Sequence, residues 1–170
     1  MMGIKLGVII SLMLFVINGY SQAPVNSVSG KVVDTIFINN LLQQSKDRLS
    51  DDPDKAISLA IKAKESAEKI DFLKGKGYAL KYIGLAYYTQ GKFPETLSYW
   101  NESLQIFENL KDELGVANLL NNIGGLYADQ GDQEKGLEYC LRSLKLSEKI
   151  GGPIGCARSG CARSGWHGSG

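Results

Sequence analysis

The side chains capable of metal or nucleophilic chemistry are few and lie near the C-terminus. The three cysteines are Cys140, Cys156 and Cys161, and the single histidine is His167. The Cys-x4-Cys spacing lacks the tight knuckle of zinc ribbons, and a fourth ligand is missing. A disulfide between Cys156 and Cys161 is favoured over a metal site if the compartment is oxidising. We expect no metal site, no cofactor and no histidine-dependent catalytic triad.

Paired carboxylates could serve as general acid and base. The closest pairs in the sequence are Asp51–Asp52, Glu65–Glu68 and Asp112–Glu113. They lie in lysine-rich segments with helical spacing, where they are typical of helix N-caps and solvated ion pairs. We therefore predict that the protein is not an enzyme, and turnover by the purified protein would revive that alternative.

Composition limits the class of protein further. Of 170 residues, 44% are hydrophobic and 22% are charged, which is ordinary for a globular chain. The 19 basic and 18 acidic side chains give a net charge of +1. Because a large nucleic-acid-binding surface needs clustered excess Lys and Arg, we expect no nucleic-acid partner.

Residues 1–21 have the pattern of a signal peptide. Lys5 supplies a short positive region, and the apolar run over 6–17 is shorter than the roughly 20 residues of a spanning helix. This shortness disfavours the alternative of an uncleaved anchor. Small residues then match a signal-peptidase site, and we predict cleavage between Ser21 and Gln22. The protein is expected to be exported, periplasmic or extracellular, with no stable membrane insertion after cleavage.

The chain repeats itself with a period of 40 residues. LKYIGLAYYTQG at residues 80–91 returns as LNNIGGLYADQG at residues 120–131. Such a period is the signature of repeat architectures in which each unit stacks on the next. A long coiled coil is disfavoured because recurring glycines interrupt any sustained heptad.

Each period predicts two helices. Leu80, Ile83, Gly84 and Tyr87 form one stripe of an amphipathic helix. Gly91 lies where that helix must end, and a proline three residues later suits the first turn of the next helix. Glycine inside a helix costs about 1 kcal/mol relative to alanine, so we predict that the second helix approaches closely at Gly84.

This spaced pattern resembles the tetratricopeptide repeat family, in the longer-period form of kinesin light chains. The matching positions are Leu80, Ile83, Gly84, Tyr87, Gly91, Thr96, Trp100 and Ser103, then Leu120, Ile123, Gly124, Tyr127, Gly131, Gly136, Cys140 and Ser143. The resemblance implies an all-α, right-handed α-solenoid of about three antiparallel helix pairs, with units near 34–74, 75–114 and 115–150. Residues 22–33 are expected to be a linker and 151–170 a Gly-rich disordered tail.

The first unit is degenerate. Shifted by 40 residues, Gln44 and Asp47 stand at the places of the glycine and the tyrosine of the stripe, which is typical of a terminal cap. In the last unit Cys140 takes the place of Trp100 and is predicted to be a small buried hydrophobe.

In this family the first helices line a concave groove, so the resemblance implies a binding surface. The lining positions would be Tyr78, Lys81, Tyr82, Leu85, Tyr88 and Thr89, then Asn118, Asn121, Asn122, Gly125 and Asp129. Tyrosines and asparagines suit an extended peptide or partner segment. The alternative is that the rings pack against neighbouring helices and the asparagines face solvent. Clamping of a C-terminal carboxylate is not expected, because Leu85 stands where such grooves have asparagine.

We therefore predict a non-catalytic protein–protein interaction module. Repeats like these also precede a membrane helix and a histidine kinase or nucleotide cyclase in exported bacterial proteins, so a sensor fragment of a longer signalling protein is the alternative. The last predicted helix, ending near Ile150, is followed by no amphipathic stripe. Local instability of the third unit, or self-association through its uncovered end, is thus expected.

The leader makes a direct prediction. N-terminal sequencing of exported protein should begin at Gln22, because signal peptidase cleaves after the small residue Ser21. A protein recovered from the cytoplasm with Met1 still at its N-terminus would contradict export.

Overall fold

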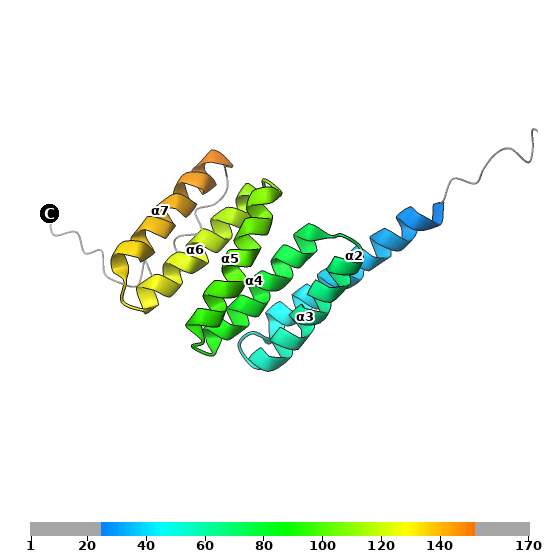
Figure 1. The fold of residues 1–170 in the computed structure, drawn as a ribbon, viewed down its shortest axis with the longest axis horizontal. Helices are drawn as coiled ribbons and strands as arrows, with labels where there is room; N and C mark the ends of the chain where they lie inside the picture. The colour runs from blue at the N-terminus through cyan, green and yellow to red at the C-terminus, as the bar shows by residue number, and fades with distance from the viewer. Residues whose placement is uncertain (1–24, 152–170) are drawn as a thin grey trace, which may run out of the picture. The chain divides into compact units, whose positions relative to one another are not determined.

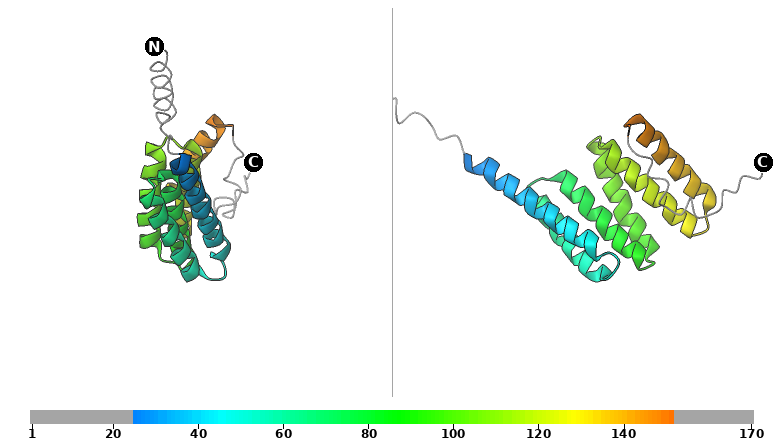
Figure 2. Two further views of the ribbon diagram at one scale, coloured as in Figure 1. Left: turned by 90° about the vertical axis from the view of Figure 1, so that its right-hand side faces the viewer. Right: turned by 180° about the vertical axis from the view of Figure 1, so that it is seen from behind.

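The computed structural model describes residues 25–151, where the chain forms six α-helices and no strand. They are α2 (Val25–Arg48), α3 (Pro53–Lys69), α4 (Leu73–Thr89), α5 (Phe93–Asn109), α6 (Glu113–Asp129) and α7 (Gln133–Lys149). Helices α3 to α7 follow one another side by side, joined by short turns (Figures 1 and 2). The predicted all-α fold built from helix pairs is confirmed. The leader, Cys156, Cys161 and the tail lie outside the described residues.

The chain divides into two compact units, Met1–Val33 and Asp34–Gly170. The described part of the first unit is the beginning of α2, which starts at Val25. Residues 25–33 are thus helical, although a linker was expected over 22–33. Once a helix is nucleated, adding residues costs little, and no proline follows Pro24 within α2. None of the described helices is both long and apolar enough to cross a membrane.

Four helix ends between α3 and α7 use the same hydrogen-bonded turn. The residue after each C-cap has positive φ: Asp71 at 54°, Gly91 at 72°, Lys111 at 54° and Gly131 at 86°. The next amide donates to a carbonyl five residues back, as Lys92 N does to Tyr87 O at 3.0 Å. This is the Schellman arrangement, which satisfies the last carbonyls of a helix. The predicted role of Gly91 is confirmed.

Aspartates begin three of the helices. The carboxylates of Asp52, Asp112 and Asp132 accept hydrogen bonds from the backbone amides of Lys55, Gly115 and Lys135. Each satisfies an amide that has no partner within its own helix. These acidic residues are therefore structural caps, as the sequence predicts for Asp51–Asp52 and Asp112–Glu113.

Helix pairs approach closely at the mid-helix glycines. A Cβ on Gly84 would lie 2.4 Å from Cδ1 of Trp100, a side chain that is 1% exposed. A Cβ on Gly124 would lie 2.8 Å from Sγ of Cys140, which is buried. Any larger residue at either glycine must move the partner helix. The predicted packing role of Gly84 and the predicted burial of Cys140 are confirmed.

The first unit departs from the 40-residue register. Ser45 Oγ donates to the carbonyl of Ala56 at 2.8 Å. The corresponding carbonyl in the next unit, that of Thr96, would lie 3.2 Å from a Cβ on Gly84. Ser45 therefore takes the place of Gly84, one residue later than the expected Gln44.

A shorter turn explains this shift. The amide of Asp52 bonds to the carbonyl of Arg48 four residues back, whereas Lys92 reaches Tyr87 five residues back. Positive φ is confined to other turns among the described residues, so the turn between α2 and α3 lacks the left-handed residue. Omitting one turn residue rotates α2 by about 100° relative to a constant register.

The rotation gives the first unit a polar outer side. Counted with a 39-residue shift, Asn40, Gln44 and Asp47 correspond to buried positions of α4, yet all three are exposed. Ile38, Leu41 and Leu42 instead form the buried side, with relative exposures of 0%, 5% and 6%. A polar outer side is what a terminal cap of a repeat stack requires.

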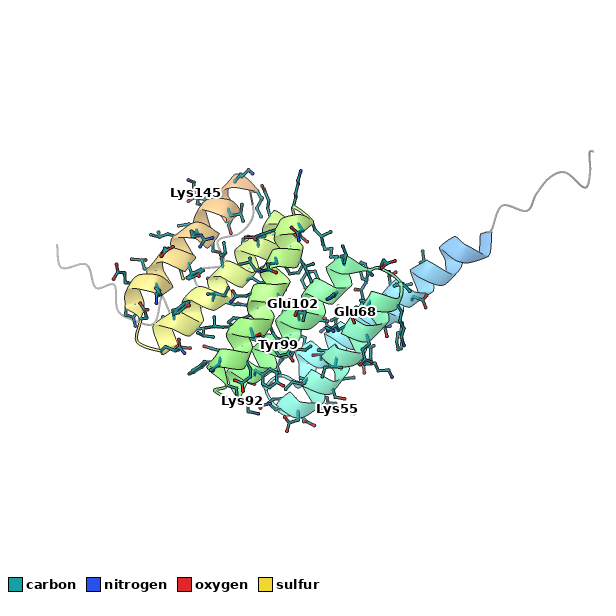
Figure 3. All side chains as sticks on the ribbon, viewed as in Figure 1. Lys55, Glu68, Lys92, Tyr99, Glu102 and Lys145 are labelled. Atoms are coloured by element: carbon teal, nitrogen blue, oxygen red, sulfur yellow. The ribbon has the colours of Figure 1, made fainter. Side chains whose placement is uncertain are left out.

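Ion pairs connect the units on the side of α3 and α5. Lys76 Nζ lies 2.9 Å from Glu68 of α3 and 3.6 Å from Glu102 of α5 (Figure 3). Lys74 of α4 lies 2.8 Å from Asp112, the cap of α6. Burial raises the pKa of Asp112, whereas the hydrogen bonds from Lys74 and from the Gly115 amide lower it; the net pKa is below the usual 3.8.

Substitutions at the turns test the cost of positive φ. Lys111→Gly should raise the free energy of unfolding by about 1 kcal/mol, because only glycine adopts this conformation without a Cβ penalty. Gly131→Ala is the matched control and should lower it by a similar amount, since a Cβ there contacts nothing within 4 Å. Urea denaturation measures both. Loss of stability in Lys111→Gly would contradict the assignment.

The Lys74–Asp112 pair makes a pH-dependent prediction. Asp112→Asn keeps a capping side chain and removes the charge, so it should cost about 1 kcal/mol at pH 7. Because the pKa of Asp112 is lower in the folded state, its carboxylate stabilises the fold above the unfolded pKa and loses this effect as pH falls. Denaturation curves of the two proteins should therefore converge below about pH 4. An equal difference in acid would show that the charge is not responsible.

Candidate binding surface

The predicted site residues lie on the first helices of the second and third units. Those on α4 are Tyr78, Lys81, Tyr82, Leu85 and Tyr88, and those on α6 are Asn118, Asn121, Asn122 and Asp129. The hydroxyl of Tyr88 donates to the carboxylate of Asp129, which brings α4 and α6 together on this side. We call this side, with the adjoining residues Asn39, Gln43 and Lys46 of α2, the α2/α4/α6 face.

The tyrosine rings belong partly to the core. The ring of Tyr78 meets that of Phe107 edge to face, with centroids 5.0 Å apart. Tyr88 packs on Phe93 at 6.1 Å and on Trp100 at 5.7 Å. All these tyrosines are half-buried, as is Leu85. The rings therefore pack against neighbouring helices, as the alternative interpretation holds, and a partly exposed surface remains on each.

Lys81 is a half-buried cation. Its ammonium lies 5.7 Å from the ring centroid of Tyr78 and 5.8 Å from that of Tyr82. Burial, and then the positive charge of Lys46, lower the pKa of Lys81. Burial likewise raises the pKa of Tyr82, so its phenol stays neutral and can donate and accept hydrogen bonds.

Other half-buried lysines differ from Lys81 in having carboxylate partners. Lys64 and Lys76 lie 3.0 Å and 2.9 Å from Glu68. Over residues 25–151, no carboxylate oxygen lies within the 4.0 Å ion-pair distance of the Lys81 ammonium. Lys81 has lost part of its hydration and gained only aromatic faces in return.

The asparagines have three different surroundings. Asn118 is exposed and donates to the carbonyl of Leu114 at 2.9 Å, within its own helix. Asn121 is half-buried and already has an interaction partner. Asn122 is half-buried, and its amide makes no hydrogen bond with the described part of the chain. Asn122 is thus the asparagine best able to bond to a ligand.

Three other positions on this side are constrained. Gly125, expected to line the groove, is buried and offers no side chain. The hydroxyl of Thr89 donates to the carbonyl of Ala86 at 2.8 Å. The exposed carboxylate of Asp129 is engaged by Tyr88. Their hydrogen-bonding groups are largely used within the protein.

Lys46 is the functional candidate that the sequence prediction missed. With the 40-residue register it falls outside the expected stripe, whereas the 39-residue shift places it at the position of Leu85. The sequence holds one signal of this shift: Leu41 and Ser45 have the large-then-small spacing of Leu80 and Gly84. Its charge acts on Lys81, so the α2/α4/α6 face has two neighbouring cations.

The described residues hold no group of three or more His, Cys, Asp or Glu side chains arranged to bind a metal ion. Cys140, the cysteine that the structure describes, is buried. The chemistry available on the α2/α4/α6 face is therefore hydrogen bonding, cation–π contact and ion pairing.

Comparison with known proteins agrees with this architecture. A family model described as tetratricopeptide repeat matches residues 76–149. Photosystem I assembly protein Ycf3 of Rippkaea orientalis is 34% identical over 67 residues, 39% of this chain and 37% of that protein. The Acaryochloris marina protein of the same name is 32% identical over 74 residues, 42% of this chain and 43% of that protein. The matched region thus spans less than half the length of either relative.

Two solved structures have the same helical arrangement. The TPR domain of Arabidopsis FLU superimposes with a TM-score of 0.61 at 22% identity, covering 68% of this chain and 98% of that one. Aspartyl phosphate phosphatase F from Bacillus subtilis superimposes with a TM-score of 0.57 at 21% identity, covering 76% of this chain and 32% of that one. At these identities the likeness concerns the fold. Together with the 40-residue period and the paired helices, these matches show that this chain belongs to the tetratricopeptide repeat family.

Proposed function

We propose that the α2/α4/α6 face binds an extended segment of a partner protein, and that this segment presents an acidic side chain to Lys46 and Lys81. The observation that carries the proposal is the half-buried ammonium of Lys81, which has aromatic neighbours and no carboxylate partner among the described residues. The proposed activity is binding without catalysis.

An acidic side chain would compensate both lysines. A partly desolvated cation gains most from a charged acceptor, because such hydrogen bonds are roughly twice as strong as neutral ones. Lys46 adds a second positive charge on the same side. The same arrangement is unfavourable for a basic segment, so charge would also provide specificity.

The remaining polar groups suit the backbone of such a segment. The Asn122 amide can donate to a peptide carbonyl and accept from a peptide N–H, and the neutral phenol of Tyr82 can do either. The rings of Tyr78 and Tyr82 offer rigid apolar area next to the cation. Anchors of this kind typically dominate the energy of an interface.

The relatives support a role in protein association. Tetratricopeptide repeats generally bind protein partners, and Ycf3 is by its name an assembly protein of photosystem I. For this chain we infer only the general activity, binding of a partner protein. We further propose that it acts outside the cytoplasm, on the strength of the leader pattern in residues 1–21.

A peptide library tests the partner's chemistry. Selection of displayed random dodecapeptides on the purified protein should enrich sequences with Asp or Glu, because only an anion compensates Lys81. Lys81→Ala should weaken binding of the enriched peptides about tenfold, whereas Lys55→Ala, which removes an exposed lysine of α3 (Figure 3), should leave it unchanged. Enrichment of basic or purely apolar peptides would contradict the proposal.

A double substitution tests the polar and aromatic anchors. Replacing Tyr82 and Asn122 together by alanine should cost about 1–2 kcal/mol in binding of the same peptides, as loss of interface anchors does. Circular dichroism should show unchanged helicity, since both residues are only half-buried. Unchanged affinity in a folded double variant would exclude this face as the binding site.

A further inference from the structure

Helix α7 carries leucines on a side that no described helix covers. Leu137 is 47% exposed and Leu141 is 55% exposed, and Leu144 beside them is half-buried. At about 100° per residue the three side chains fall within an arc of about 60°. They form a continuous apolar strip, which we call the α7 strip.

The preceding unit shows how such a strip is normally covered. Leu97 and Leu104 of α5 correspond to Leu137 and Leu144, and they are half-buried against a cluster that includes Leu119 and Leu126 of α6. The α7 strip is also more apolar than its counterpart, because Leu141 stands where α5 has Asn101. An exposed leucine at a position where the previous unit has a polar residue indicates a partner other than the ordinary next helix.

Charges beside the α7 strip change sign along the helix. The N-terminal half carries Glu134 and Glu138, and the C-terminal half carries Lys145. Glu138 and Lys145 lie on the same edge of the strip, about 20° apart around the helix. Both are exposed, and Figure 3 shows Lys145 on α7 at the end of the row of helices.

We propose that two copies of this chain pair through the α7 strip, with their α7 helices antiparallel around a two-fold axis near Leu141. In this arrangement Leu141 meets its own copy and Leu137 meets Leu144 of the other chain. Glu138 of each chain then lies close to Lys145 of the other, about two residues from exact opposition. The charge pattern is therefore self-complementary, as an isologous two-fold interface requires.

A second copy fits this strip better than the opposite end of the same stack. The outer side of α2 presents Asn40, Gln44 and Asp47, all exposed and polar. Head-to-tail pairing would bury these groups against leucines without hydrogen-bond partners, which is costly. The two-fold arrangement also leaves the α2/α4/α6 face unused, so it is independent of the proposed partner binding.

Complementary charge reversals test the pairing. Glu138→Lys alone places two lysines together at each contact, and Lys145→Glu alone places two glutamates together. Each variant should dimerise at least about tenfold more weakly than the original chain in sedimentation equilibrium. An equimolar mixture of the two variants should regain the dimer, because both contacts between unlike chains are then attractive. Lys55→Glu on α3 is the matched control and should dimerise normally.

The mixing experiment also guards against misfolding, since a variant that cannot fold cannot regain the dimer when mixed. A chain that sediments as a monomer up to about 0.5 mM would overturn the proposal, whether the strip is covered by another part of the chain or by nothing. A dimer that both single variants retain would place the interface elsewhere and equally overturn it. Failure of the mixture to associate would exclude the antiparallel geometry.

Discussion

The close approach of paired helices at one small residue is the constraint on which the rest of this structure depends. At Gly84 the second helix comes so near that a single added carbon would lie 2.4 Å from Trp100. Trp100 can be fully buried there because its indole N–H donates to the carbonyl of Lys81 at 3.1 Å. A buried indole without such an acceptor would be costly. The same contact therefore packs the pair and holds the segment of α4 that carries Lys81.

The third unit meets the same constraint with a different pair of residues. Cys140 replaces the indole, and Gly136 replaces Thr96, so the backbones themselves come together at Gly124. A buried serine in each second helix bonds across the pair: Ser103 to the carbonyl of Gly77 and Ser143 to that of Ala117, both at 2.7 Å. Two side-chain solutions thus preserve one helix geometry, which explains why the bond positions repeat after 40 residues although the packing residues do not.

The two surfaces that follow from this stack differ in chemistry because they face different elements. The α2/α4/α6 face combines tyrosine rings, two lysines and an amide without a described partner, which suits reversible contact with a polar, charged segment. The α7 strip combines leucines with charges of both signs, which suits a symmetric contact with itself. The polar outer side of α2 suits neither, and it ends the stack towards water.

Much of the helical architecture could be predicted from the sequence, because periodicity, glycine positions and caps are local properties. The stripe of Leu80, Ile83, Gly84 and Tyr87 predicts a buried helix face, and Gly91 predicts its end. The close contact at Gly84 also followed, since only packing explains a glycine inside a helix. The burial of Cys140 followed from its equivalence to Trp100.

Only the tertiary structure decided the register of the first unit and the state of individual side chains on the candidate site. The turn after α2 is one residue shorter, which a constant repeat cannot reveal, and this brings Lys46 rather than Leu49 to the position of Leu85. Whether an exposed-pattern residue is available depends on its neighbours in space: Tyr88 is engaged by Asp129 and Asn118 by its own helix, while Asn122 is not engaged by any described residue. Periodicity assigns a residue to a face of its helix, but hydrogen bonds and burial arise between helices that are distant in the sequence, and they decide what that residue can still bind.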